Sequence, residues 1–121
     1  MNRFVIIFLL MSFLLVSCDN RQTKSLLQDV ETYIQERPDS ALRVLRKVDS
    51  LTLNTKSLRA RYSLLFAMAL DKNYIDTTAL SILEPTVAYY ERLGSPQDKM
   101  LSCYYLGRIY ANRKDYPNAV I

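Results

Sequence analysis

The chain has 121 residues, half of them hydrophobic, and its sixteen Lys and Arg against twelve Asp and Glu give a formal charge of +4. It has no His, which removes the commonest general base and metal ligand, and its two Cys are too few for a four-ligand metal cluster. The basic residues are scattered among acidic ones, which argues against a nucleic-acid partner. With two Gly and four Pro, the composition favours long helices.

The first seventeen residues have the pattern of an export signal. Arg3 makes the start positive, and residues 4–16 (FVIIFLLMSFLLV) contain one polar residue, Ser12. This stretch is shorter than the roughly twenty residues that span a bilayer, and it has the length of the hydrophobic region of a secretory signal. We therefore expect residues 1–17 to be a signal peptide.

The signal ends at a cysteine. Leu15, Val16, Ser17 and Cys18 resemble the bacterial lipobox at all four of its positions. The resemblance implies cleavage before Cys18 and acyl chains on that residue, which would hold the protein on a membrane without a spanning helix. Residues 18–23 then form a short polar tether. Two alternatives stay open: an ordinary cleaved signal followed by a chance Cys, and an uncleaved N-terminal anchor.

The remaining chain, residues 24–121, is expected to be one helical repeat domain. Apolar residues recur at helical spacing and predict three hairpins, at about 24–48, 54–93 and 96–121. The third helix is almost continuously apolar over residues 64–70, which predicts burial on two sides.

Local signals predict the helix boundaries of the first half. Pro38 is expected to end the first helix, since the residue before Pro is disfavoured in the helical region, and Asp39 is expected to cap the second helix. Asn54 or Thr55 is expected to cap the third helix.

The second half has a firmer boundary signal. Asp76 or Thr77 is expected to cap a fourth helix that is kinked at Pro85. Gly94 is a helix C-terminal signal, and Ser95 begins a helix with Pro and an acid in its first turn.

A small residue recurs at the expected start of each second helix. Ala41, Ala79 and Ala119 lie in similar surroundings, 38 and 40 residues apart. A small Ala there would let the two helices of a hairpin approach closely. The alternative is that Ala-Leu pairs are common in any helix.

The last stretch carries a family resemblance. Leu106, Gly107, Tyr110 and Ala119 have the spacing of a tetratricopeptide (TPR) repeat over residues 100–121. The fold that this resemblance implies is all-α: stacked antiparallel hairpins in a TPR-like right-handed solenoid, with the last hairpin incomplete. Because the chain stops in mid-helix, we expect a fragment of a longer protein, or else a short protein with an incomplete last helix.

The earlier hairpins depart from the TPR pattern. Phe66 stands where Gly is expected, and the period exceeds the TPR length of about thirty-four residues. The order of lipobox, hairpins and TPR is similar to lipoproteins of Bacteroidota. In that group such segments often precede further repeats, and sometimes a membrane segment with a regulatory domain.

The TPR resemblance also implies a partner-binding face on the first helix of the last hairpin. Its candidate residues are Leu101, Tyr104, Arg108, Ala111 and Asn112. An aromatic residue with Arg and Asn on a concave face suits a peptide or a glycan, although it does not match the carboxylate-clamp type of TPR groove. The alternative is that these residues only pack the hairpins together.

No catalytic constellation is found in the sequence. It has no Gly-rich phosphate loop and no nucleophile elbow, and Cys103 has no activating neighbour and is expected to be a buried packing residue. We therefore expect no enzyme, no cofactor and no metal site.

Three functions remain as hypotheses. The leading one is a lipid-anchored protein-interaction module of the cell envelope, on the cell membrane or the outer membrane, facing the periplasm or the cell surface. The others are a glycan-binding lipoprotein of nutrient uptake and the sensor segment of a longer envelope regulator. The membrane, the protein or peptide partner and the oligomeric state stay open.

Overall fold

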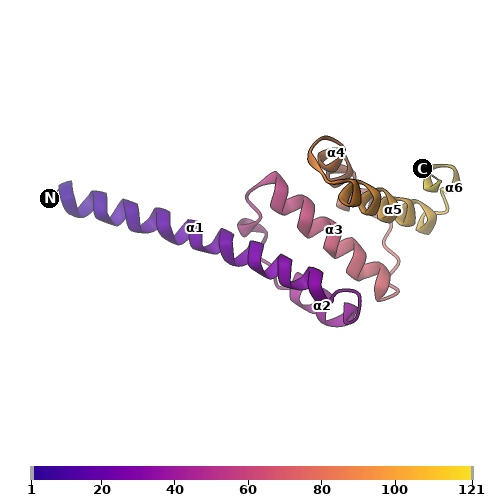
Figure 1. Ribbon diagram of the computed structural model, residues 1–121, viewed down its shortest axis with the longest axis horizontal. Helices are drawn as coiled ribbons and strands as arrows, with labels where there is room; N and C mark the ends of the chain where they lie inside the picture. Colours follow the sequence, from indigo (N-terminus) through magenta and orange to yellow (C-terminus); the bar gives the residue numbers. More distant parts are fainter. Residues whose placement is uncertain (1, 121) are drawn as a thin grey trace.

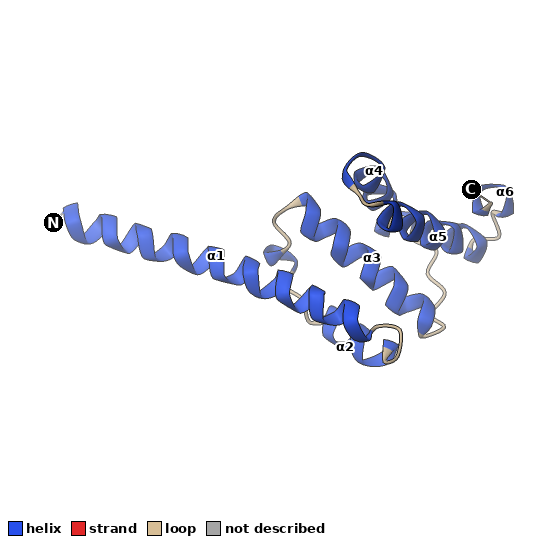
Figure 2. Ribbon diagram, in the orientation of Figure 1, coloured by secondary structure: helices blue, strands red, loops and turns tan. Residues whose placement is uncertain are grey.

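The protein is all-α over the part that the structure, a computed structural model, describes (Figures 1 and 2): residues 2–120, with side chains for 2–9 and 20–120. Its α-helices are α1 (Asn2–Tyr33), α2 (Pro38–Arg46), α3 (Lys56–Lys72), α4 (Glu84–Leu93), α5 (Pro96–Asn112) and α6 (Tyr116–Ala119). Two short 3-10 helices, η1 (Ser50–Thr52) and η2 (Leu80–Ile82), lie in the connections.

Helix α3 is the centre of the body. It packs against α1 and α2 on one side and against α4 and α5 on the other. Six of the seven side chains in residues 64–70 are buried, and Phe66 is half-buried, so the predicted burial on two sides is confirmed. Each helix otherwise packs mainly against its neighbours in the chain, as in a stack of hairpins.

Helix α1 extends far beyond the other helices (Figure 1), and residues 2–17, which lie in this projecting part, are called the arm. The arm carries exposed apolar side chains; those of Phe4 and Phe8 are 81% and 78% exposed. Residues 18–23, the expected tether, continue the same helix, and Thr23 is already buried. Over the described residues, none of the helices has both the length and the apolar character needed to cross a membrane.

The prediction that Asp39 caps the second helix was wrong. Helix α2 begins at Pro38, with Arg37 at its N-cap and Asp39 in its first turn. Proline is tolerated there because the first N–H groups of a helix have no partner within the helix, and an acid in the first turn suits the helix dipole. Helix α1 ends at Tyr33, before the proline can interfere.

The two predicted hydroxyl caps are confirmed. Thr55 Oγ1 accepts a hydrogen bond from the N–H of Leu58, and Ser95 Oγ accepts one from the N–H of Asp98, both at 3.1 Å. Gly94 also ends α4 as expected, although its φ of −85° is not left-handed. A glycine is needed there for space, since a Cβ would lie 2.7 Å from the Cβ of Tyr90.

The prediction of a fourth helix kinked at Pro85 was wrong. Neither Asp76 nor Thr77 caps an α-helix; the chain is irregular until the 3-10 helix η2, and α4 begins at Glu84 with Pro85 in its first turn. A proline at that position begins a helix and does not kink it. Ala79 is consequently exposed ahead of η2, so it does not hold two helices together.

Helices α3 and α5, with the turns that follow them, repeat at an interval of forty residues. Helices α3 and α5 each have seventeen residues and begin forty residues apart. The turns that follow them also match: Tyr74 and Lys114 have φ values of 58° and 62°. The N–H of the residue after each of these two bonds back to a carbonyl five residues earlier, both at 2.9 Å, as in a Schellman helix end.

This period changes the alignment of the repeats. The residue of α3 that corresponds to Gly107 is Ala67, which is small and buried, and not Phe66 as expected from the sequence. A similar contact also recurs between hairpins. The amide of Asn73 donates to the Pro38 carbonyl, and the amide of Asn112 donates to the Thr77 carbonyl, both at 2.9 Å.

Candidate functional site

The predicted binding helix, α5, borders an open hollow of about 490 Å³ against α6, called the α5–α6 hollow. Its lining residues are Met100, Cys103, Tyr104, Gly107, Arg108, Ala111 and Ala119. The residues from α5 follow one stripe of that helix, since they recur every three or four positions. The side chains of Met100 and Tyr104 are 63% and 57% exposed, so a partner can reach them.

The structure brings together three of the five predicted face residues. Tyr104, Arg108 and Ala111 line the hollow. Leu101 is half-buried and packs against the core, and the amide of Asn112 is bonded to the Thr77 carbonyl. These last two residues hold the hairpins together. The sequence left this packing role open as the alternative for all five predicted face residues.

Sequence reasoning missed the other lining residues from α5. Met100, Cys103 and Gly107 lie on the same stripe as Tyr104 and Arg108. The helical spacing alone would have found them, because Met100 lies one turn before the tyrosine of the predicted face, and Cys103 and Gly107 lie between the members of that face at spacings of three or four residues. Cys103 is half-buried at this hollow, so it is not a core residue.

The close approach of α5 and α6 forms one wall of the hollow. A Cβ placed on Gly107 would lie 2.9 Å from the carbonyl oxygen of Ala119. This distance is too short for a real side chain, so α6 can lie here only because residue 107 is a glycine. The twelve-residue spacing of Gly107 and Ala119 therefore corresponds to a contact in space.

Arg108 is the charged group of the hollow. Its Nε donates to Asp71 Oδ1 on α3 at 3.0 Å, and this hydrogen bond and the carboxylate charge raise the pKa of Arg108. The side chain is 46% exposed. Beside it, the Tyr104 ring meets the Tyr105 ring edge-on, with centroids 5.0 Å apart, which fixes the direction of the exposed ring.

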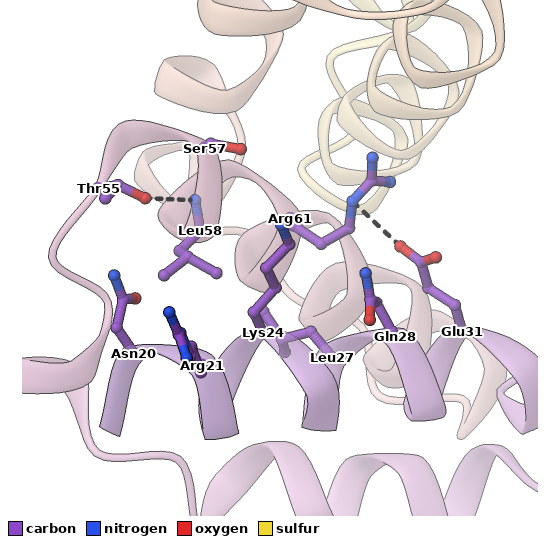
Figure 3. Close-up of a pocket in the computed structure, with 10 residues that line it drawn as sticks. All are labelled: Asn20, Arg21, Lys24, Leu27, Gln28, Glu31, Thr55, Ser57, Leu58 and Arg61. Carbon is purple, nitrogen blue, oxygen red and sulfur yellow. Dashed lines mark hydrogen bonds and ion pairs between the residues drawn. The ribbon is translucent and has the colours of Figure 1, made fainter. Parts of the chain in front are cut away.

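A second hollow, of about 470 Å³, lies between α1 and the start of α3 (Figure 3) and is called the α1–α3 hollow. Its lining includes Arg21 and Lys24 from α1, and Thr55, Ser57 and Arg61 from the α3 side. Figure 3 shows the Lys24 side chain reaching from α1 toward α3. The sequence analysis did not single out this place, because its residues lie about thirty-five positions apart in the chain.

Arg61 contacts three other helices from this position. Its Nε lies 3.0 Å from Glu31 Oε1 on α1, its Nη1 donates to Asp98 Oδ1 on α5 at 2.9 Å, and its guanidinium carbon lies 5.4 Å from the ring centre of Tyr90 on α4. Burial alone would raise the pKa of Asp98, but the hydrogen bond and charge of Arg61 outweigh it, helped by Ser95, and lower that pKa.

Tyr90, the tyrosine that Arg61 contacts, has a strongly shifted pKa. Burial raises its pKa to about 12, against the opposing effect of the Arg61 charge. Its hydroxyl oxygen is buried and has no hydrogen-bond partner among the described residues.

A third hollow, of about 570 Å³, lies between α3 and α4 and is called the α3–α4 hollow. It is lined by Lys56, Arg59, Ala60, Pro85, Thr86, Ala88, Tyr89, Arg92 and Leu93. Three of these residues are basic and none is acidic.

Cys18, the predicted lipid-attachment residue, lies outside the residues whose side chains the structure describes. Among the described residues, no group of three or more metal-ligating side chains is found. Comparison with protein-family models, with curated proteins and with solved structures gives no match for this chain.

Proposed function

We propose that the protein is a membrane-anchored lipoprotein of the cell envelope whose TPR-like helical repeats serve as a protein-interaction module. The observation that carries the anchor is the four-residue lipobox at the end of an apolar segment. The projecting arm is the segment that cleavage before Cys18 would remove, and its exposed apolar side chains suit the membrane that an export signal enters before it is cleaved.

The module is supported by the repeated hairpins. Stacked hairpins leave a continuous surface on which an extended segment of a partner can lie. The contact between Gly107 and Ala119 supports the TPR resemblance of the last hairpin. The α5–α6 hollow then provides the docking point, with the exposed ring of Tyr104 as an anchor beside Arg108. The predicted role as the sensor segment of a longer regulator is compatible with the same surface.

A glycan is the alternative ligand of this hollow. The observation that favours it is the exposed tyrosine ring with a charged donor next to it, a combination that stacks on a sugar and bonds its hydroxyls. The amide of Asn112, which sequence reasoning offered for this purpose, is already bonded to a backbone carbonyl.

The anchor is tested by metabolic labelling with palmitate in a bacterial host. The chain has two Cys, so Cys103→Ala is a matched control for Cys18→Ala. We expect the wild type and Cys103→Ala to incorporate label and Cys18→Ala to incorporate none. Equal labelling of all three chains would rule out acylation at Cys18.

The binding surface is tested with a peptide array and a glycan array probed by the full chain. Tyr104→Ala should abolish binding to whichever array responds, whereas Tyr74→Ala should not, because Tyr74 is 93% exposed and lies outside the hollow. A response on peptides alone supports the interaction module, and one on glycans alone supports the alternative. Binding that survives Tyr104→Ala would rule out this hollow as the site.

A further inference from the structure

The first turns of α3 lie between two hollows that are lined by basic side chains. On one side, the α1–α3 hollow contains Arg21 and Lys24. On the other side, the α3–α4 hollow contains Lys56, Arg59 and Arg92. These five side chains come from three helices and are all exposed, and they are called the basic end.

The basic end has no carboxylate paired with it among the residues whose side chains are described. Among the ion pairs found over the described residues, none involves a residue of the basic end. The one carboxylate that lines either hollow, Glu31, is paired with Arg61. Arg59 donates through Nη1 to the Leu53 carbonyl, which fixes its position without neutralising its charge. The basic end therefore carries five positive charges without an ion-pair partner among the described side chains.

Two residues of the basic end, Arg21 and Lys24, lie next to the proposed point of membrane attachment. Arg21 and Lys24 follow Cys18 on the same continuous helix, at about 5 Å and 9 Å along its axis given a rise of about 1.5 Å per residue. The distance for Arg21 is within the Debye length of about 8 Å at physiological salt, and the distance for Lys24 is close to that length. Arg21 and Lys24 are close to the membrane if acyl chains on Cys18 anchor the protein, and they are equally close if an uncleaved arm anchors it. In Figure 1 the start of α3 faces the arm, and α6 lies at the opposite end of the body.

We infer that the basic end rests on the bilayer and contacts the headgroups of anionic phospholipids. The inference depends on the proposed membrane anchor and adds to it an orientation and a lipid preference. The contacts hold the body upright on the membrane, so that the α5–α6 hollow at the far end faces away from the lipid and stays open to a partner. The occupant is a lipid surface because the positive charge surrounds the attachment point, where lipid headgroups are the nearest anions.

Vesicle binding of the protein purified from an acylating bacterial host tests this orientation. The lipid concentration at half-binding is measured on neutral phosphatidylcholine vesicles and on vesicles with one quarter phosphatidylglycerol. Each basic residue near an anionic surface contributes roughly a factor of five in affinity. We therefore expect the wild type to bind the anionic vesicles at least about tenfold more tightly, and Lys56→Gln/Arg59→Gln/Arg92→Gln to lose most of that preference. Arg21 and Lys24 are left unchanged because they adjoin the processing site.

The control variant removes the same charge from the other end of the body. Lys72→Gln/Arg113→Gln/Lys114→Gln changes residues at the C-terminal ends of α3 and α5, and it should keep the full preference. If both variants lose the preference equally, net charge explains it and the inference fails. Raising the salt tests the wild type without any substitution: the preference should disappear, and a preference that persists would contradict the inference.

The remaining outcomes separate the orientation from the anchor. Equal, tight binding to both vesicles leaves the anchor standing and overturns the basic end as a lipid contact, as expected if that end instead served an acidic protein. Binding to neither vesicle overturns the anchor and the orientation together.

Discussion

Arg61 and Asp98 are joined by a hydrogen bond of 2.9 Å between α3 and α5, and they lie thirty-seven residues apart in the chain. The Asp98 side chain is only 16% exposed and that of Arg61 is 31% exposed, so water screens the pair weakly. The same guanidinium also contacts Glu31 and Tyr90. This one side chain therefore joins α3 to α1, α4 and α5.

The first prediction concerns the removal of this guanidinium. Arg61→Met keeps the length of the side chain but leaves Asp98 without its charge partner, so we expect the free energy of unfolding to fall by about 2–3 kcal/mol. The matched control is Arg108→Met, whose pair with Asp71 is more exposed and should contribute less than about 1 kcal/mol. Urea unfolding followed by circular dichroism measures both, and equal losses would contradict the central role of Arg61.

The second prediction concerns pH. Because the pKa of Asp98 is lowered in the folded state, the ionised carboxylate favours folding. Its contribution is present above the unfolded pKa of about 4 and is lost as the pH falls through the lower folded value. The difference in unfolding free energy between the wild type and Asp98→Asn should thus be larger at pH 6 than at about pH 3. A difference that does not change over this range would show that Asp98 is not held ionised by Arg61.

The third prediction concerns the hydroxyl of Tyr90. Its oxygen is buried with no partner among the described residues, so removing it in Tyr90→Phe should leave stability unchanged or raise it by about 1 kcal/mol. One tyrosine that ionises near pH 12 should also disappear from the absorbance titration. Tyr74→Phe, at an exposed position, is the control. A clear loss of stability in Tyr90→Phe would mean that the hydroxyl is hydrogen-bonded.

The fourth prediction concerns the contact of α5 with α6. In a free helix, replacing Gly with Ala stabilises by about 1 kcal/mol. In Gly107→Ala the new Cβ would meet the Ala119 carbonyl at 2.9 Å, so we expect a loss of about 1–3 kcal/mol from overpacking. Gln97→Ala, on an exposed part of the same helix, should be nearly neutral. Thermal unfolding measures the sign, and a stabilised Gly107→Ala would show that α6 does not pack there.

Signals that act within one turn were predictable from the sequence. Thr55 and Ser95 cap their helices because each bonds an N–H only three residues away. The apolar run of residues 64–70 is buried as predicted, since a helix with apolar side chains on all sides has to be covered on all sides. The pairing of Gly107 with Ala119 follows from a spacing that the sequence shows directly.

The prolines mark the limit of such local reasoning. Pro38 and Pro85 were expected to end or kink a helix, yet each lies in the first turn of one. A proline can end or kink one helix or stand in the first turn of the next. Which of these occurs depends on which neighbouring segment packs against the body as a helix. The mistaken register at Phe66 has a similar origin, because only the matching turns at Tyr74 and Lys114 establish the forty-residue period.

By itself, the sequence determined the all-α class, the capped ends of the long helices and the identity of the central buried helix, because each depends on residues within a few turns of one another. Only the tertiary structure decided which polar groups remain free. It bonds Asn112 to Thr77 and leaves Tyr104 exposed, it couples Arg61 to Asp98, and it gathers Arg21, Lys56 and Arg92 around the first turns of α3. Such groups meet only when helices distant in the chain are packed together, and no local pattern encodes that packing.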